Sequence, residues 1–433
     1  MAPDSLRSPL FWLAAVVLLA SLGKMARTIE EAPAIDFYHY WLVGQIVRSG
    51  EARDIYAPEA RVALGELYWQ RAQRPEVPSA QRAAAEKFRR LETTSTPFLY
   101  AAFAPFVTGD YDWDRVAYNA LSSLLLLISV AGLCRGLRYG ALASVLILVF
   151  ATVGFEPTYF DVRVGNVNRI EFALLTAFLL LPADGERHEV VRGVVLGLAV
   201  MFKPNLALPA GAIALLRFAG GEWWRLAYEL LGMALGAGAA LLAASRFFGG
   251  FDIWLDWLRA ASNLARDFPL SSGEGNLALA PLLGTWLGAF AERAFSIAAA
   301  GAAALLLVAA AWRAAGSAAV ADSRARLRAE LLAVGVGCAV SLLVSPLAWV
   351  HYYVLALFLV LFVLSPSADD VPGWRLAVTI ACVAATAMGP LLNPLLISEA
   401  RIWAIVGNLG LIGLIALALI ELSGRTRAAG RSS

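Results

Sequence analysis

One acidic residue, Asp36, stands where the first hydrophobic segment of the chain ends and its longest polar segment begins. The next five positions hold four aromatic residues and His39. A lone carboxylate in such a place can take a proton from an acceptor hydroxyl group. We therefore interpret Asp36 as a candidate catalytic base at the mouth of a membrane-embedded cavity. The alternative is that Asp36 only caps the helix that begins beside it.

Other polar residues stand at the ends of later hydrophobic segments. They are Glu156, Asp161, Arg163, Asn166, Asn168, Arg169, Glu171, Lys203, Asn276, Trp349 and His351. Ionisable groups at a bilayer boundary face a cavity or a partner, because contact with lipid is costly. Cations and a histidine can hold a phosphate. Aromatic faces and amides suit a sugar. If the leaving group is already a phosphate, one base and several cations suffice for glycosyl transfer, unlike the paired carboxylates of glycoside hydrolysis.

The same residues have purely structural alternatives. His39 and His351 would be aromatic residues at the membrane interface. Lys203 would extend to lipid headgroups. The remaining side chains would form ion pairs with neighbouring carboxylates or bonds between helices, namely Arg163, Arg169, Asn166 and Asn168.

The composition predicts an all-α polytopic membrane protein. Of 433 residues, 60% are hydrophobic and only 16% are charged, whereas a soluble domain is about half apolar and about a quarter charged. A net charge of +2 gives no signal for nucleic-acid binding. The three scattered cysteines form neither a disulfide framework nor a metal-ligand cluster. No acidic pair is placed for a cation, so we expect no metal and no cofactor.

About 12 apolar segments approach the length of roughly 20 residues that a membrane span needs. They begin near Leu10, Asp114, Ala141, Asn168, Val190, Asn205, Arg225, Ala294, Ala329, His351, Trp374 and Ile402. Arginines concentrate in alternate loops, including those with Arg192 and Arg217, which predicts that both termini are cytoplasmic. We expect one integral membrane domain over 1–433, with extracytoplasmic segments at 27–113 and 247–293.

Both extracytoplasmic segments carry signals for helices at the interface. Apolar residues of 37–47 repeat at helical spacing, and so do those of 251–258. Pro58 can begin a helix that runs to about Gln73. Ser79 can cap another that runs to about Leu91. An apolar stretch over 97–103 is too short to span the membrane.

Five sequence motifs resemble those of glycosyltransferase family 87, in the same order. They are Asp36-Phe37 with Gly50 and Ile55-Tyr56, Thr96-Pro97-Phe98-Leu99, Gly165-Asn166-Val167-Asn168, Phe202-Lys203-Pro204, and Ser345-Pro346-Leu347-Ala348-Trp349-Val350-His351. Three departures affect acceptor and sugar identity. The second motif lacks one proline, asparagine replaces glutamine at 166, and alanine replaces serine at 348.

The resemblance implies a bundle of the GT-C superfamily and an inverting transfer on the extracytoplasmic face of a bacterial inner membrane. A sugar, with mannose expected, would pass from a polyprenyl phosphate to a lipid or glycan hydroxyl group. Asp36 matches the catalytic aspartate. His351, with Lys203 and Arg169, would hold the donor phosphate. We expect the sugar and acceptor to contact Asn166, Asn168, Trp349, His39 and Asn276.

Two other functions fit the hydropathy. A lipid or glycan transporter would need polar residues through the middle of its spans, and this sequence has few charges there. A non-enzymatic subunit of envelope assembly would not need Asp36 and His351 to converge. The distance between these two side chains therefore separates the enzyme from the assembly subunit.

Overall fold

A computed structural model describes residues 8–51, 54–263, 276–282, 323–365, 373–388 and 400–429, together with residues 298, 306 and 308–310. Throughout these parts of the chain the regular structure is helical and no strand occurs. The predicted all-α class is therefore confirmed. Most of the span predicted near Ala294 lies outside the described residues.

Five helices of the described chain are long and apolar enough to cross a membrane. They are α1 (Pro9–Glu31), α6 (Tyr111–Gly136), α12 (Trp223–Phe248), α17 (Ser323–Val344) and α21 (Ala400–Ala429). A sixth span results if the pair 141–154 and 156–164, bent by 55°, counts as one. The predicted number of about 12 spans is therefore not confirmed.

Shorter helices form much of the rest of the described bundle, and several of them begin near other predicted starts. They are α7 (Ala141–Val149), the π-helix η3 (Phe150–Gly154), α8 (Glu156–Val164), α9 (Asn168–Leu180), α10 (Glu186–Phe202), η4 (Pro204–Leu206), α11 (Ala207–Ala219), η6 (Val350–Ala356), α18 (Leu357–Leu364) and α19 (Gly373–Ala387). Several of these helices are broken by proline or by a change of helix type, so that they end before reaching the usual length of a span.

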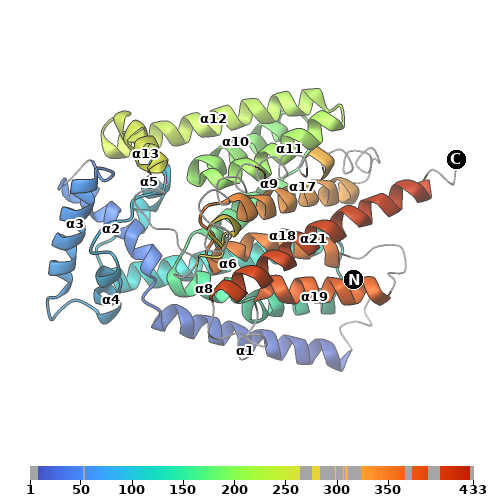
Figure 1. Ribbon diagram of the computed structural model, residues 1–433, viewed down its shortest axis with the longest axis horizontal. Coiled ribbons are helices and arrows are strands. Elements are labelled where there is room, and N and C mark those ends of the chain that lie inside the picture. The colour runs from blue at the N-terminus through green and yellow to red at the C-terminus, as the bar shows by residue number, and fades with distance from the viewer. Residues whose placement is uncertain are drawn as a thin grey trace.

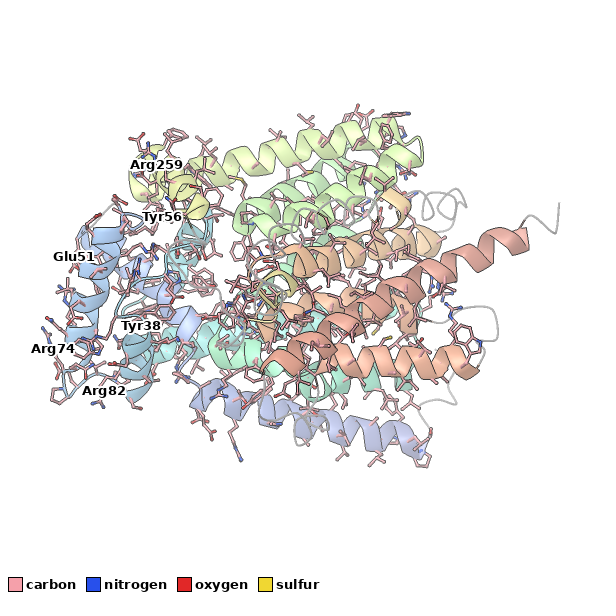
Figure 2. The ribbon with its side chains drawn as sticks, in the orientation of Figure 1. Tyr38, Glu51, Tyr56, Arg74, Arg82 and Arg259 are labelled. Atoms are coloured by element: carbon pink, nitrogen blue, oxygen red, sulfur yellow. The ribbon has the colours of Figure 1, made fainter. Side chains whose placement is uncertain are left out.

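The first polar segment folds into a helical unit, which we call the cap. It contains α2 (Ile35–Ser49), α3 (Pro58–Ala72), α4 (Ser79–Lys87), α5 (Pro97–Phe103) and η2 (Ala104–Phe106). In Figure 1 the cap lies beyond one end of the long helices, and the start of α1 and the end of α21 lie at the opposite end. Figure 2 shows Arg74 and Arg82 on the side of the cap that faces away from the bundle.

The helices predicted within the polar segments are present, but α2 is not the surface helix that its periodicity suggests. Residues 37–44 of α2 are all buried. Their aromatic rings pack together, for example Tyr38 on Trp41 with centroids 5.9 Å apart and Phe37 on Tyr118 at 4.9 Å. The second predicted amphipathic helix is α13 (Asp252–Ser262), which buries only Ile253 among its residues. Thus α2 is the core of the cap, while α13 keeps the expected surface character.

Two arginines expected in cytoplasmic loops are buried inside helices instead. Arg192 lies 2.7 Å from Glu330, and Arg217 lies 3.1 Å from Glu229 and also contacts Glu330. All of these side chains are at most 3% exposed. These ion pairs lie towards the N-terminal end of α10, whereas Lys203 follows its C-terminal end. They connect neighbouring helices and do not indicate a cytoplasmic loop.

Glycine allows α10 and α12 to approach each other closely. A Cβ on Gly232 would overlap the carbonyl oxygen of Val190, and one on Gly236 would overlap that of Val194. Membrane helices use small residues in this way, because close backbone contact replaces the hydrophobic effect that is missing in lipid. Gly238 lies on the same helix, and its Cβ would meet no atom within 4 Å.

We predict that Gly232→Ala destabilises the protein by about 1–3 kcal/mol, because the added methyl group overpacks the contact of α10 with α12. Gly238→Ala is the matched control and should be neutral or slightly stabilising, because alanine favours a helix. Thermal unfolding of the purified protein in detergent measures both. Equal melting temperatures for the two variants would contradict the close contact.

Candidate functional site

The start of α2 presents Asp36 to the bundle. The helix begins after Ala34, which has φ of +50°, and no side chain caps it. Asp36 lies in the first turn, and its Oδ2 accepts a hydrogen bond of 2.6 Å from Nδ2 of Asn166. The capping alternative therefore does not occur. The positive end of the helix dipole favours the ionised carboxylate.

A glycine brings Asn166 against α2. Gly165 ends α8 with φ of +70°, a conformation that glycine adopts without strain. A Cβ at this position would lie 2.9 Å from the Cβ atoms of both Ala34 and Phe37. Glycine thus serves both the left-handed turn and the close approach that places Asn166 beside Asp36.

The Asn166 carboxamide joins Asp36 to His351. Its Oδ1 accepts from the Val167 backbone N–H at 2.7 Å, which orients Nδ2 towards the two side chains. Nδ2 then lies 2.6 Å from Asp36 Oδ2 and 3.2 Å from His351 Nε2. His351 Nε2 is itself 3.6 Å from Asp36 Oδ2. With Nδ2 as the donor, Nε2 of His351 is an acceptor in this arrangement.

Lys203 continues this polar network on its other side. Nζ lies 2.7 Å from Glu171 Oε1, donates to Asn168 Oδ1 at 3.2 Å and stands 4.3 Å from the centre of the Tyr352 ring. Asn168 Nδ2 donates in turn to Asn166 Oδ1 at 3.2 Å. An unbroken chain of hydrogen bonds therefore runs from the carboxylate of Asp36 through two amides to the ammonium group.

Arg169 is close to this network but does not reach its accessible side. Its side chain is fully buried and pairs with Asp161 at 2.6 Å. It also donates to Asn119 Oδ1 at 2.7 Å and Ser123 Oγ at 2.6 Å. The buried position of Arg169 therefore argues against its predicted contact with a donor phosphate. Arg169 instead positions Asp161, which accepts at 2.7 Å from Asn168.

His39 and Asn276, predicted to contact sugar or acceptor, also have structural partners. The His39 ring stacks on Phe88 at 5.5 Å, and its Nε2 lies 3.0 Å from the Tyr100 hydroxyl group. Burial, with the charge of Arg61, lowers the pKa of His39 to about 3. Asn276 donates to the Pro346 carbonyl at 3.0 Å and accepts from the Ala348 N–H at 2.9 Å. It therefore shapes the loop that leads to His351.

Trp349, the remaining predicted sugar contact, is the half-buried residue that precedes η6. Two tyrosines were not anticipated as part of the site. Tyr118 donates to the Asn166 carbonyl at 2.6 Å, and Tyr352 lies under Lys203. Tyr352 could have been suspected from its place beside His351. Nothing in the sequence separates Tyr118 from the other residues of α6.

Three titratable side chains of the network keep access to the outside. Side-chain exposure is 23% for Asp36, 20% for Lys203 and 10% for His351. Burial raises the pKa of Asp36 to about 7, while the hydrogen bond from Asn166 opposes that shift. Asp36 is therefore poised to exchange a proton near neutral pH, where a general base is most effective.

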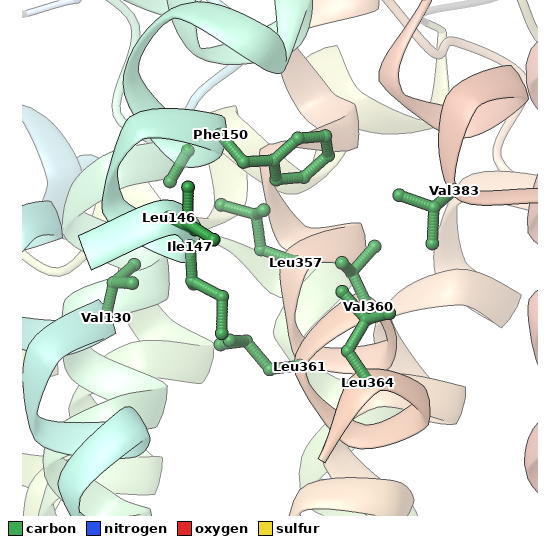
Figure 3. Close-up of a pocket in the computed structure, with 10 residues that line it drawn as sticks. Val130, Leu146, Ile147, Phe150, Leu357, Val360, Leu361, Leu364 and Val383 are labelled. Atoms are coloured by element: carbon green, nitrogen blue, oxygen red, sulfur yellow. The ribbon is translucent and has the colours of Figure 1, made fainter. Parts of the chain in front are cut away.

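Among the described residues, no group of three or more histidine, cysteine or acidic side chains could hold a metal ion. The cleft shown in Figure 3, between α6, α7, α18 and α19, is lined by apolar side chains such as Val130, Phe150 and Val383. It therefore carries no group for acid–base chemistry. The network around Asp36 is where the described chain brings such groups together.

Comparison with known proteins gives one match. The model of glycosyltransferase family 87 matches residues 94–346, more than half of the chain. This range contains Asn166, Asn168 and Lys203, whereas Asp36 precedes it and His351 follows it. No curated protein matches, and no solved structure matches.

We predict that Arg169→Met destabilises the protein by about 3–5 kcal/mol, because it leaves the buried carboxylate of Asp161 without its cation. Adding Asp161→Asn should restore part of this loss, since the neutral amide still offers an acceptor to Asn168. The same Asp161→Asn change alone should be destabilising. The Asp161→Asn change should therefore lower stability on its own and raise it when added to Arg169→Met. Thermal unfolding of the three variants measures both effects, and additive losses of stability would refute the buried pair.

Proposed function

This chain belongs to glycosyltransferase family 87, and from that premise we propose that it moves a sugar from a polyprenyl phosphate to a hydroxyl group. The family makes the chain a membrane glycosyltransferase. We propose mannose as the sugar, a lipid or glycan as the acceptor, and the extracytoplasmic face of a bacterial inner membrane as the place. One observation carries the proposal. Asp36 and His351 come from opposite halves of the chain and meet at 3.6 Å.

Asp36 is the proposed base. Its carboxylate takes the proton of the acceptor hydroxyl group while that oxygen attacks the anomeric carbon of the donor. The bond from this carbon to the phosphate oxygen breaks, and its electron pair leaves with the polyprenyl phosphate. Attack opposite to the leaving group inverts the configuration. No acid is needed, because the leaving group is already an anion.

Lys203 and His351 are the proposed partners of the departing phosphate. An ammonium group stabilises the charge on the leaving oxygen. An in-line reaction needs the base and the leaving group on opposite sides of the sugar carbon, so the scheme requires that His351 move away from Asp36 when the donor binds. His351 lies in η6, and Lys203 lies directly after α10. The proposed phosphate contacts therefore come from two separate elements.

Asn166 and Trp349 are the proposed walls of the sugar site, and Asn168, which is fully buried, holds Asn166 and Lys203 in place. Asn166 bonds to the carboxylate of Asp36, and Asn168 bonds to the ammonium group of Lys203. His39, Asn276 and Arg169 take no direct part in this scheme, because their side chains bond to protein groups other than Asp36, Lys203 and His351. The proposed reaction uses neither a nucleotide sugar nor a cofactor.

We expect Asp36→Asn to lower kcat/KM by about 10²–10⁴-fold, because the amide cannot accept the hydroxyl proton. The assay is transfer of labelled sugar from a synthetic polyprenyl-phosphate donor by the purified protein. Glu156→Gln is the matched control, since it neutralises another partly buried carboxylate outside the network. Near-normal transfer by folded Asp36→Asn would remove the proposed base.

The rate should also depend on pH through the ionisation of Asp36. With a pKa of about 7, kcat/KM should fall about tenfold per pH unit below that value and level off above it. Asn166→Ala removes a hydrogen bond that favours the ionised form, so its acid limb should move to higher pH. An unchanged limb in Asn166→Ala would show that another group controls the profile.

A further inference from the structure

A second cavity lies between the cap and the membrane-facing helix α12. It has a volume of about 500 Å³, within the range of roughly 300–1,000 Å³ that is usual for small-molecule sites. Its walls are aromatic or small, except for one arginine. They are formed by Phe98, Ala101 and Ala102 of α5 and by Ala243, Arg246 and Phe247 of α12.

Arg246 gives this groove a charge. It lies in the last turn of α12 and is exposed. No carboxylate of the described chain pairs with it, in contrast to Arg259 on α13, which lies 2.9 Å from Asp256. An arginine at the end of a membrane span extends to the interface, where its charge can meet a lipid phosphate. The cleft of Figure 3, by comparison, is lined by apolar residues alone.

The wall formed by α5 is fixed to the end of α10. Thr96 caps α5, and its hydroxyl group donates to the Met201 carbonyl at 2.7 Å. The ring of Phe98 meets that of Phe202 edge to face, with centroids 6.5 Å apart. Phe202 directly precedes Lys203. A molecule in the groove therefore contacts α5, which in turn contacts the residues just before Lys203, but it does not contact Lys203 itself.

We propose that this groove binds an anionic diacyl phospholipid of the surrounding bilayer. The phosphate pairs with the Arg246 guanidinium group, which can contact two phosphate oxygens at once. An acyl chain lies between Phe98 and Phe247, over the small side chains of the two helices. The lining offers no amide or hydroxyl side chain to recognise a sugar, so the groove fits a bilayer lipid rather than the glycosyl donor.

The test uses photoactivatable phosphatidylglycerol and phosphatidylcholine in otherwise identical phosphatidylcholine nanodiscs. We expect peptides of α5 and α12 to be labelled about tenfold more by the anionic lipid, because the choline cation of phosphatidylcholine competes with Arg246 for the phosphate that both lipids carry. Arg246→Gln should reduce labelling to the phosphatidylcholine level. Arg259→Gln is the control for loss of an exposed arginine and should label as the unchanged protein does.

A second pair of variants tests the apolar wall. Ala243→Trp fills the groove and should abolish labelling by both lipids there, whereas Leu242→Trp adds the same ring at an exposed position outside the lining and should not. Equal labelling by the two lipids, or no loss in Arg246→Gln, would overturn the proposal. Displacement of the probe by polyprenyl phosphate but not by phosphatidylglycerol would also overturn it. Labelling needs no sugar transfer, so its outcome is independent of the catalytic proposal.

Discussion

The hydrogen bonds of one carboxamide, that of Asn166, determine how the two halves of the site meet. Its Nδ2 lies between Asp36 of α2 and His351 of η6, and its oxygen accepts the N–H of its own neighbour, Val167. A partly buried carboxylate without such a donor would lose both its position and much of its ionisation. The glycine turn at Gly165 is what allows this contact, because a larger residue would collide with α2.

The site has a cost in stability that its chemistry explains. The pKa of Asp36 is raised by burial to about 7, so the folded protein binds this proton more tightly than the unfolded chain does. Stability therefore falls as the pH rises from about 4 towards 7 and the proton is lost. The same burial brings the carboxyl group into the range where a base works at neutral pH. Lys203, by contrast, already has a carboxylate partner in Glu171.

The sequence predicted which types of residue form the site better than it predicted the directions in which their side chains point. Asp36, Lys203 and His351 stand at ends of apolar segments, where an ionisable group needs a cavity or a partner, and the structure joins them in one network. Arg169 and His39 satisfied the same rule but turn into the protein, to Asp161 and Tyr100. Which way a side chain points depends on tertiary packing, which local periodicity does not contain.

The fold shows the same contrast between features that the sequence predicts and features that depend on tertiary packing. Helix positions in the polar segments followed from proline, serine and hydrophobic spacing. Helix α3 begins at the expected Pro58, and α4 begins at Ser79, although no side chain caps it. The burial of α2 did not follow, because a stripe of aromatic residues looks alike in a membrane interface and in a protein core. Arg192 and Arg217 were expected in loops for a similar reason. Their partner Glu330 is distant in sequence, so the buried ion pairs appear only in three dimensions.

The most direct measurement is an experimental structure of the protein with a non-transferable polyprenyl-phosphonate sugar bound. The account predicts that the phosphonate contacts Lys203 and His351, and that Asp36 faces the anomeric carbon from the side opposite to the phosphonate. A sugar bound away from Asp36, or a phosphonate held by neither Lys203 nor His351, would contradict it.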